Sequence, residues 1–167
     1  MEAVEYLAAL GHRHIARVGG LPGFLHTAIR TQAFDDICRQ LDLAPPVTIS
    51  TDYTGEDGTR ATRRLLAARD RPTAILYDND IMAVAGLSVA REMGFSVPGD
   101  LSLIAWDDSI LCQLVHPPLT AMSRNIPAYG ASAARQLLKV INEGTAISVQ
   151  DETAHLTPRG STARPGS

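Results

Sequence analysis

Acidic and amide side chains gather directly after two apolar segments of the chain. The segments span residues 73–77 and 101–105, and the group comprises Asp78, Asn79, Asp80, Asp107 and Asp108. Carboxylates in such places either hold Mg²⁺ beside a substrate phosphate or accept hydrogen bonds from the hydroxyls of a polyol. Helix capping is the structural alternative, because Asp80 and Asp108 both precede apparent helices. Asp107 is then left without a capping role, so it is the carboxylate that most strongly indicates a ligand.

Arg30 and Tyr53 are further candidates for ligand contacts. Arg30 lies near the start of an expected helix, where its guanidinium either pairs with a carboxylate or presents a fork of N–H donors to ligand oxygens. Tyr53 follows a short expected strand and either stacks on an apolar ligand surface or covers the local core. The glycines of residues 19–23 lack the G-x-G-x-x-G spacing, so we expect a plain turn there rather than a phosphate cradle.

Signatures of the common catalytic sites are absent from the sequence. It contains no His-Glu-x-x-His, Gly-x-Ser-x-Gly or Cys-x-x-Cys motif. His12 and His14 have a spacing that could hold a metal, but a surface or structural role is favoured. Cys38 and Cys112 have no adjacent His to activate them, and two cysteines make neither a disulfide framework nor a thiolate cluster. We therefore predict a non-enzymatic protein without a metal or a cofactor.

Length, composition and charge restrict the class of protein further. The 167 residues are 45% hydrophobic and 20% charged, which is typical of a soluble globular chain with one domain or two small lobes. The net charge of −3 argues against sequence-independent binding of nucleic acid. No apolar run approaches the length of a membrane span, and the first residues lack the features of a secretory signal. We expect a cytoplasmic protein with reduced thiols.

Strand-like and helix-like segments alternate along the chain and would bring the candidate side chains together. We expect strands at residues 14–19, 47–49, 73–77, 101–105, 119–123 and 154–157, and helices at residues 2–10, 27–41, 54–68, 80–93 and from Pro127. Most strands are continuously apolar, which is typical of an α/β fold with a parallel sheet flanked by helices. Ligands of such folds bind at the carboxyl ends of the strands. From Arg159 onward, the Gly, Ser and Pro content predicts a mobile tail.

The expected helix at residues 80–93 is apolar nearly all round, which indicates burial on more than one side. The sheet would cover one side and another subunit the other. Two groups of side chains are candidates for that contact: Val84, Leu87 and Arg91 along this helix, and Leu111, Leu114 and Val115 in the short segment that follows the next strand. Because closed two-fold symmetry is the commonest arrangement of soluble oligomers, we predict a homodimer through these two groups.

Short motifs follow one another in a characteristic order along nearly the whole chain. They are Leu10-Gly11-His12-Arg13-His14-Ile15-Ala16, Arg30 with Phe34, Arg71-Pro72-Thr73-Ala74-Ile75, Asn79-Asp80 with Met82-Ala83, Val97-Pro98-Gly99-Asp100-Leu101-Ser102, Trp106-Asp107-Asp108, Pro118-Leu119-Thr120, Tyr129-Gly130 and Arg159-Gly160-Ser161-Thr162. Each motif is weak alone, but in this order and spacing they resemble the lactose-repressor (LacI/GalR) family of bacterial transcription regulators. Trp106 stands where that family more often has Tyr or Phe, a departure that leaves Asp107 in place.

The resemblance implies a periplasmic-binding-protein-like effector domain with two lobes joined by crossover strands, of which this chain matches the later portion. Residues 1–11 would form a linking helix, 12–122 the C-terminal lobe, 123–153 a segment of the N-terminal lobe, and 154–167 a return strand and tail. The family's helix-turn-helix, its hinge helix and most of the first lobe have no counterpart here, which indicates a fragment. Operator DNA would then be bound only through that missing N-terminal domain.

The resemblance also implies roles for particular residues. Arg30, Asn79 and Asp107 fall at positions that hold effector hydroxyls or base atoms in the family. Tyr53 falls where an aromatic ring often stacks on the ligand, and Arg124 where a polar contact on the crossover is common. The two predicted contact groups fall in the family's two-fold dimer contact. We therefore predict the sensing part of a repressor, which binds a sugar or a related polyol and responds through lobe closure. A sugar-binding protein of a transport system is the second hypothesis, and a magnesium-dependent phosphotransfer enzyme is the third.

Overall fold

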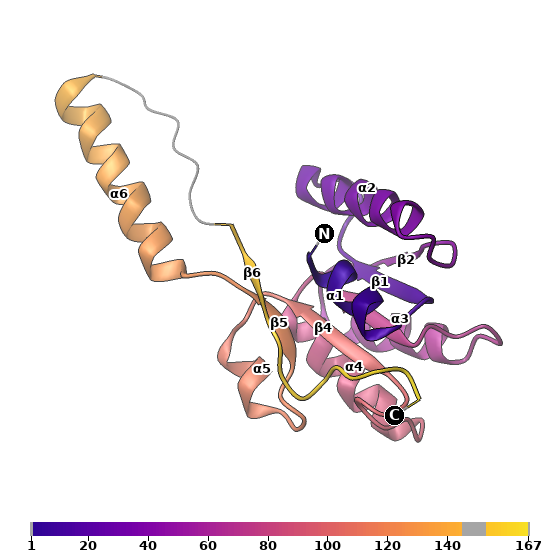
Figure 1. The fold of residues 1–167 in the computed structure, drawn as a ribbon. Helices are drawn as coiled ribbons and strands as arrows, with labels where there is room; N and C mark the ends of the chain where they lie inside the picture. Colours follow the sequence, from indigo (N-terminus) through magenta and orange to yellow (C-terminus); the bar gives the residue numbers. More distant parts are fainter. Residues whose placement is uncertain (1, 145–152, 167) are drawn as a thin grey trace.

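A six-stranded sheet with helices on both faces forms the body of the chain (Figure 1). The computed structural model describes residues 2–144 and 153–166. The helices are α1 (Glu2–Leu10), α2 (Leu25–Gln40), α3 (Gly55–Leu66), α4 (Asp80–Glu92), α5 (Ile110–Leu114) and α6 (Ile126–Glu143). The strands are β1 (Ile15–Gly19), β2 (Val47–Ser50), β3 (Ala74–Tyr77), β4 (Ser102–Trp106), β5 (Thr120–Ser123) and β6 (His155–Thr157). The predicted α/β class is therefore confirmed.

The sheet has the strand order β2-β1-β3-β4-β5-β6 and is mixed rather than purely parallel. Strands β1 to β5 run parallel, as their apolar sequences predict. The last strand, β6, pairs antiparallel with β5 and places Leu156 opposite Met122. The reason lies in α6, which projects away from the sheet instead of packing across its face (Figure 1). The chain therefore returns beside β5 in the opposite direction, without the crossover that a parallel strand needs.

Alternate side chains of the strands build two cores, one on each face of the sheet. Ile75 and Tyr77 of β3 belong to the core beneath α3 and α4. Ala74 and Leu76 of the same strand belong to the core beneath α1 and α2. All four side chains are buried. This arrangement explains why β3 is continuously apolar in sequence, since both of its faces are covered.

The starts of α3, α4, α5 and α6 have side-chain caps, although two of the caps are not the residues predicted, and α2 starts after Phe24 without one. Thr54 caps α3, because its side chain accepts a hydrogen bond from a backbone N–H of the first turn. Helix α4 is capped by Asn79 instead of Asp80, and α5 is capped by Ser109 instead of Asp108. An N-cap needs an extended backbone, which Asn79 has (φ −150°, ψ 170°), whereas Asp80 already lies within the helix.

The apolar helix α4 is covered on its second side by α3 of the same chain, so its apolar sequence is explained without another subunit. Gly58 of α3 lies so close to α4 that a Cβ on it would come within 2.9 Å of the Met82 backbone. Leu87 is only 3% exposed and belongs to this core. Leu87 therefore has almost no surface left to contribute to the predicted dimer contact. Leu111 and Leu114, by contrast, are 41% and 74% exposed.

The segment after β6 is packed into the sheet, so the predicted mobile tail is wrong for the residues that the structure describes. The Ser161 side chain is buried between the first residues of β4 and β5. Its hydroxyl donates to the Leu103 carbonyl at 2.6 Å and accepts from the Thr120 N–H at 2.8 Å. The Nε2 atom of the buried His12 lies 2.9 Å from the Ala163 carbonyl oxygen. Hydroxyl and ring groups thus satisfy buried backbone atoms, which composition alone does not reveal.

Helix α6 has no buried residue along its described length and leaves the body of the chain (Figure 1). Its start matches the sequence, because Asn125 caps it and Pro127 lies in its first turn. Its exposed large apolar side chains are Ile126, Tyr129, Leu137, Leu138, Val140 and Ile141. None of the helices within residues 2–144 and 153–166 is both long and apolar enough to span a membrane.

Replacing Leu87 by Ala should destabilise the chain by about 2–5 kcal/mol, because the substitution leaves a cavity in the core beneath α3 and α4. Replacing Leu137 by Ala should change the free energy of unfolding by less than about 0.5 kcal/mol, since that side chain is 61% exposed on α6. Urea unfolding followed by far-UV circular dichroism measures both changes. Equal losses in the two variants would contradict the assignment of Leu87 to the core.

Candidate functional site

Three of the five predicted ligand contacts line one cavity at the carboxyl edge of the sheet. The cavity has a volume of about 290 Å³ and lies beside the ends of β4 and β5. Its lining comprises Arg30, Trp106, Asp107, Asp108, Ser109, Met122, Arg124, Ile126 and Ala154. Arg30, Asp107 and Arg124 are the predicted contacts among these, whereas Tyr53 and Asn79 lie outside the lining. We name it the strand-end cavity.

Asp107 follows β4 in a left-handed backbone conformation, with φ at +71°. Such a conformation costs a non-glycine residue about 1–3 kcal/mol and is concentrated at functional sites. Partial burial raises the pKa of the Asp107 carboxyl, the Arg30 guanidinium opposes that rise, and the Asp80 carboxylate adds to it. The position therefore combines backbone strain with an electrostatically perturbed carboxylate on the cavity wall.

Aromatic rings lie against both guanidinium groups of the strand-end cavity. The central carbon of the Arg30 guanidinium lies 4.1 Å from the centroid of the Trp106 ring, and its Nη1 donates to the Asp78 carbonyl at 3.4 Å. The Arg124 guanidinium lies 5.4 Å from the centroid of the Tyr129 ring. Stacking on a ring orients the guanidinium plane and leaves the N–H donors at its edge available for ligand oxygens.

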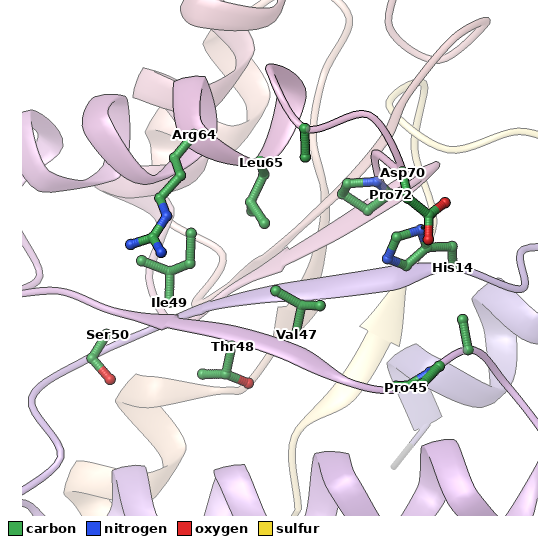
Figure 2. Close-up of a pocket in the computed structure, with 12 residues that line it drawn as sticks. His14, Pro45, Val47, Thr48, Ile49, Ser50, Arg64, Leu65, Asp70 and Pro72 are labelled. Carbon is green, nitrogen blue, oxygen red and sulfur yellow. Dashed lines mark ion pairs between the residues drawn. The ribbon is translucent and has the colours of Figure 1, made fainter.

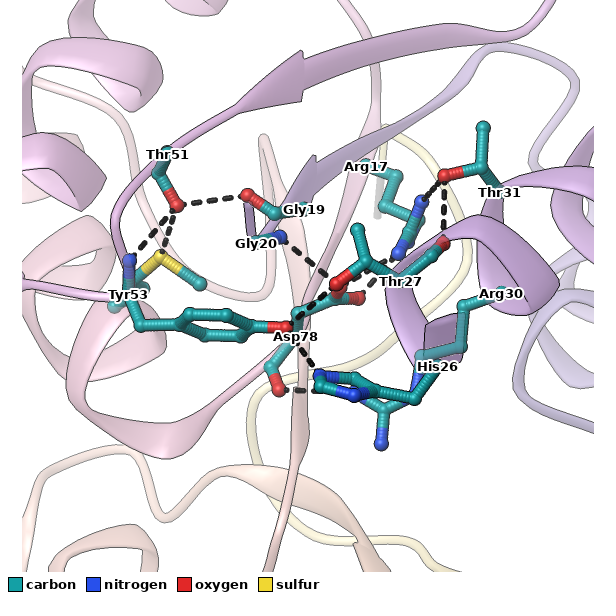
Figure 3. Close-up of polar contacts among 11 residues, drawn as sticks. Arg17, Gly19, Gly20, His26, Thr27, Arg30, Thr31, Thr51, Tyr53 and Asp78 are labelled. Atoms are coloured by element: carbon teal, nitrogen blue, oxygen red, sulfur yellow. Dashed lines mark hydrogen bonds and ion pairs between the residues drawn. The ribbon is translucent and has the colours of Figure 1, made fainter. Parts of the chain in front are cut away.

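Tyr53 is held at the sheet edge by contacts with the turn after β1 and the start of α2 (Figure 3). Its hydroxyl lies 2.8 Å from His26 Nε2 and 2.8 Å from Thr27 Oγ1. The ring covers Gly20 so closely that a Cβ there would lie 1.8 Å from the ring carbon Cζ, so only glycine fits that position. Sequence reasoning missed His26, whose ring also stacks on Phe24, because no spacing signal links it to Tyr53.

Asn79 performs a positioning role between β3 and α4. Its Oδ1 accepts the capping hydrogen bond from the Met82 N–H at 2.8 Å. Its Nδ2 donates to the Tyr53 carbonyl at 2.9 Å. The amide thereby links the start of α4 to the loop that carries Tyr53, whose φ is +70°.

A buried ion pair between Arg17 and Asp78 lies under this edge of the sheet (Figure 3). Arg17 Nε donates to Asp78 Oδ1 at 2.9 Å, and Nη2 donates to Oδ2 at 2.5 Å. The remaining partners are Thr31, which accepts from Arg17 Nη1, and the Gly20 N–H, which donates to Asp78 Oδ2. Both oxygens of Asp78 are therefore engaged, so it is not available to the magnesium site of the third hypothesis. Within the described residues, no three His, Cys, Asp or Glu side chains are placed to hold a metal ion.

Asp108 ties the cavity loop to the segments that leave and re-enter the sheet. Its Oδ2 accepts from Arg159 Nη2 at 2.7 Å and from Ser123 Oγ at 2.6 Å. Burial acts to raise the pKa of Asp108, but the hydrogen bonds from Arg159 and Ser123 outweigh it and lower the pKa below its usual range. The predicted capping role of Asp108 is therefore replaced by an ion pair, since Ser109 provides the cap.

The side chains considered for nucleophilic or metal chemistry lie in structural environments. Burial raises the pKa of both the Cys38 and Cys112 thiols to about 11, which keeps them protonated at neutral pH. His12 is buried, with its ring nitrogens near Thr73 and Ser102, and burial lowers its pKa. His14 Nδ1 lies 3.5 Å from an Asp70 carboxylate oxygen.

A second cavity of about 540 Å³ runs along the edge strand β2 (Figure 2). Val47 and Ile49 of β2 point toward Leu65 of α3, and the lining also includes the charged Arg64 and the pair of His14 with Asp70. It contains none of the five predicted ligand contacts. The strand-end cavity is smaller, but it lies at the carboxyl edge of the sheet, and Arg30 of α2, Asp107 after β4 and Arg124 after β5 converge on it.

A mostly parallel α/β sheet with a charged cavity at its carboxyl edge, and a helix that leaves the sheet, is an architecture of the ligand-binding class to which periplasmic binding proteins belong. The chain belongs to the family of the periplasmic binding protein-like domain, which matches residues 4–162. Its resemblance to LacI-type regulators is confirmed by individual relatives.

The probable HTH-type transcriptional repressor ExuR of Bacillus subtilis is 30% identical over 168 residues, which cover 93% of this chain and 50% of that protein. A LacI family transcriptional regulator from Bifidobacterium animalis subsp. lactis superposes with a TM-score of 0.94 at 45% identity, over 98% of this chain and 60% of that one. The lac repressor dimer bound to operator and the anti-inducer ONPF superposes with a TM-score of 0.88 at 27% identity, over 97% of this chain and 57% of that one. The chain thus spans about half the length of the curated relatives it matches.

Replacing Asp78 by Ala should destabilise the chain by about 3–5 kcal/mol, because it leaves the buried Arg17 guanidinium without a counter-charge. The double replacement Arg17→Met with Asp78→Leu should cost less, since it removes both charges and refills the space with apolar groups. Urea unfolding of the three proteins gives the free energies. A double variant that is less stable than the single variant would refute this explanation.

Replacing Arg30 by Met should raise the pKa of Asp107 further above its usual range, because Arg30 is the strongest of the charges that lower it. Replacing Arg63, an exposed residue of α3 that pairs with Glu92, should leave the pKa of Asp107 unchanged. An NMR titration of the side-chain carboxyl carbon measures the pKa in each protein. An unchanged or lowered value in Arg30→Met would show that the two groups are not coupled.

Proposed function

We propose that this chain is the ligand-sensing part of a LacI-type transcription regulator and that its effector is a sugar or a related polyol. The observation that carries the proposal is the strand-end cavity, where the Asp107 carboxylate and the Arg30 and Arg124 guanidinium groups share one lining with Met122 and Ile126. Carboxylate oxygens accept hydrogen bonds from hydroxyls, guanidinium groups donate to hydroxyl oxygens, and apolar side chains contact the CH groups of a carbon ring. Each chemical part of a polyol therefore has a matching group.

The comparisons support sensing over the two other hypotheses. The relatives reported above are named as transcriptional repressors and regulators, which favours neither catalysis nor solute transport. One of them is a dimer bound to operator together with a small-molecule anti-inducer. By analogy, we infer that operator DNA is bound through a helix-turn-helix segment and that the protein acts in the cytoplasm, where operators lie. The proposed sensing needs no metal and no cofactor.

We infer a two-lobed architecture in which this chain supplies most of the C-terminal lobe. Residues 1–11 are the linking helix, 12–122 the lobe itself, 123–153 a segment of the N-terminal lobe, and 154–167 the return strand and tail. The exposed apolar side chains of α6 support this division, because an amphipathic helix needs a covered face. Residues 145–152 of the third segment lie outside the described residues.

The proposed mechanism couples effector binding to the strands that connect the lobes. Ser123, the last residue of β5, places its Oγ 2.6 Å from Thr157 Oγ1 of β6 and donates to Asp108. Arg159, just after β6, pairs with the same Asp108 carboxylate. An effector that binds Asp107 therefore acts on the residue next to the contacts that orient both connecting strands. It would shift the lobes between open and closed states according to its different affinity for the two.

The proposed function is tested by titrating the 167-residue chain with D-glucose, D-galactose, D-glucitol, D-gluconate and D-glucose 6-phosphate. Trp106 is the only tryptophan of the sequence and lines the cavity, so its fluorescence reports binding. At least one of these polyols should give a saturable change. The affinity should fall about tenfold to a hundredfold in Asp107→Ala, because a ligand hydroxyl loses its acceptor.

The matched control for this titration is Asp70→Ala, which removes a carboxylate that is 96% exposed and lies outside the strand-end cavity. Its affinity for the same polyol should equal that of the unaltered chain. The proposal fails if no polyol changes the Trp106 emission, or if Asp107→Ala binds as tightly as the unaltered chain.

We also propose a homodimer through the exposed surface of α4 and α5, which we name the α4–α5 patch. Its members are the predicted residues Val84, Arg91, Leu111, Leu114 and Val115, without the buried Leu87, together with the exposed Ile81 and Ile110. Burial of these apolar side chains against their symmetry mates would remove them from water. The dimeric state of the lac repressor relative supports this assembly.

Replacing Leu114 by Arg should convert the dimer to monomers, because an unpaired charge would be buried in the contact. Sedimentation velocity at about 10 µM, a working concentration for a micromolar dimer, measures the change. Leu137→Arg, an equally drastic change on α6, is the control and should leave the dimer intact. Dissociation by Leu137→Arg but not by Leu114→Arg would assign the contact to α6 and exclude the α4–α5 patch.

A further inference from the structure

Two guanidinium groups of the strand-end cavity have no carboxylate partner. Within the described residues, neither Arg30 nor Arg124 takes part in an ion pair, and each lies instead against an aromatic ring. By contrast, Arg159, which lies beside the cavity, pairs with Asp108 of its lining. Arg30 and Arg124 therefore bring two guanidinium groups without an ion-pair partner into one cavity.

The carboxylates around the cavity do not balance this positive charge. Asp108 is neutralised by Arg159 at 2.7 Å, which leaves Asp107 as the unpaired carboxylate of the lining. Asp80 acts on Asp107 through space, but it lies outside the lining and its Oδ1 accepts from the Ile81 N–H. The lining thus presents two unpaired guanidinium groups against one unpaired carboxylate.

The geometry of the guanidinium groups suits an oxyanion. Arg30 makes one hydrogen bond, a long one of 3.4 Å to the Asp78 carbonyl, and Arg124 makes none that involves its side chain within the described residues. Most of their N–H donors are therefore free. A planar fork of donors matches the spacing of two oxygens in a carboxylate or a phosphate, and charge-assisted bonds of this kind are about twice as strong as neutral ones.

We propose that the effector of this chain is a polyol that carries an acidic group, either a carboxylate or a phosphate, bound by Arg30 and Arg124 while Asp107 accepts from its hydroxyls. This inference rests on the proposed function and narrows its ligand class from polyols in general to acidic polyols. The shared chemistry is an oxyanion attached to a hydroxylated carbon chain.

The charge of the cavity can be measured without any effector, because Arg30 covers the single tryptophan, Trp106. Quenching of Trp106 fluorescence by iodide is compared with quenching by caesium at equal ionic strength, and neutral acrylamide corrects for exposure of the ring. Each quenching constant is divided by that of free N-acetyltryptophanamide, because caesium is intrinsically the weaker quencher of indole. The normalised constant should be about threefold higher for iodide than for caesium, since a cationic cleft concentrates anions. The double variant Arg30→Met with Arg124→Met should lose this difference, whereas Arg64→Met, at an exposed arginine outside the cavity, should keep it. Equal normalised constants for the two ions in the unaltered chain would overturn the proposal.

Matched ligand pairs then separate the acidic class from neutral polyols. The 167-residue chain is titrated with D-gluconate against D-glucitol, and with D-glucose 6-phosphate against D-glucose. The acidic member of at least one pair should bind about tenfold tighter, with an affinity that falls as salt is added. The pair that shows the preference identifies the oxyanion as carboxylate or phosphate. The Arg30→Met, Arg124→Met variant should lose the preference, while circular dichroism confirms that it is folded.

The outcomes distinguish this inference from the function on which it rests. A neutral polyol that binds as tightly as its acidic partner, with dependence on Asp107, overturns the acidic ligand and leaves the sensing function standing. Binding by neither member of either pair counts against both. A preference for the acidic member that persists without Arg30 and Arg124 would place the oxyanion elsewhere and overturn the assignment of these two residues.

Discussion

The buried ion pair between Arg17 and Asp78 sets the geometry on which the ligand edge of the sheet depends. It joins the central strands β1 and β3 beneath that edge, and the Asp78 carboxylate also holds the Gly20 N–H where the chain turns out of β1. The carbonyl of the same residue faces Arg30. Withdrawing two charges from water costs about as much free energy as their attraction returns. The pair therefore acts mainly to define one arrangement of the strand ends, rather than to add stability.

From this fixed edge, the contacts that orient the candidate site extend in two directions. Toward β2, Gly20 leaves room for the Tyr53 ring, and Asn79 joins that loop to the start of α4. Toward β5, Arg30 stacks on Trp106, and the neighbouring loop is anchored through Asp108. The loop residues of the cavity lining are therefore tied to the strands by side-chain hydrogen bonds and an ion pair, which helps to hold a binding geometry in place.

Local patterns predicted the architecture because the elements obey local rules. Continuous apolar runs identify strands covered on both faces, and Thr54 and Pro127 mark helix starts through backbone requirements that act over a few residues. The cavity residues Arg30, Asp107 and Arg124 could be named because the ends of parallel strands meet at one edge. The expectation that Asp108 caps a helix, which distinguished Asp107 from it, is wrong. Ser109 provides that cap, and Asp108 pairs with Arg159.

The features that sequence reasoning missed depend on partners far apart in the chain. Arg17 and Asp78 are separated by 61 residues, so neither position reveals that the other will neutralise it. Covering α4 requires the glycine of α3 at position 58, whose importance is visible only once the two helices touch. Ser161 lies in a segment that contains Gly and Pro, and its sequence context does not reveal that its hydroxyl binds the backbone of β4 and β5.

The late position of Ser161 in the sequence has a consequence for folding during translation. The hydroxyl of Ser161 completes the hydrogen bonding of both β4 and β5 at their first residues, and the neighbouring Ala163 carbonyl meets His12 near the start of β1. During translation, the ribosome therefore releases strands β1 to β5 well before the segment that seals them. A nascent chain halted after β5 would carry an open seam between its last two strands. Unpaired strand edges of that kind make a chain prone to aggregation, so the vulnerable interval ends only when residues 159–163 emerge from the exit tunnel.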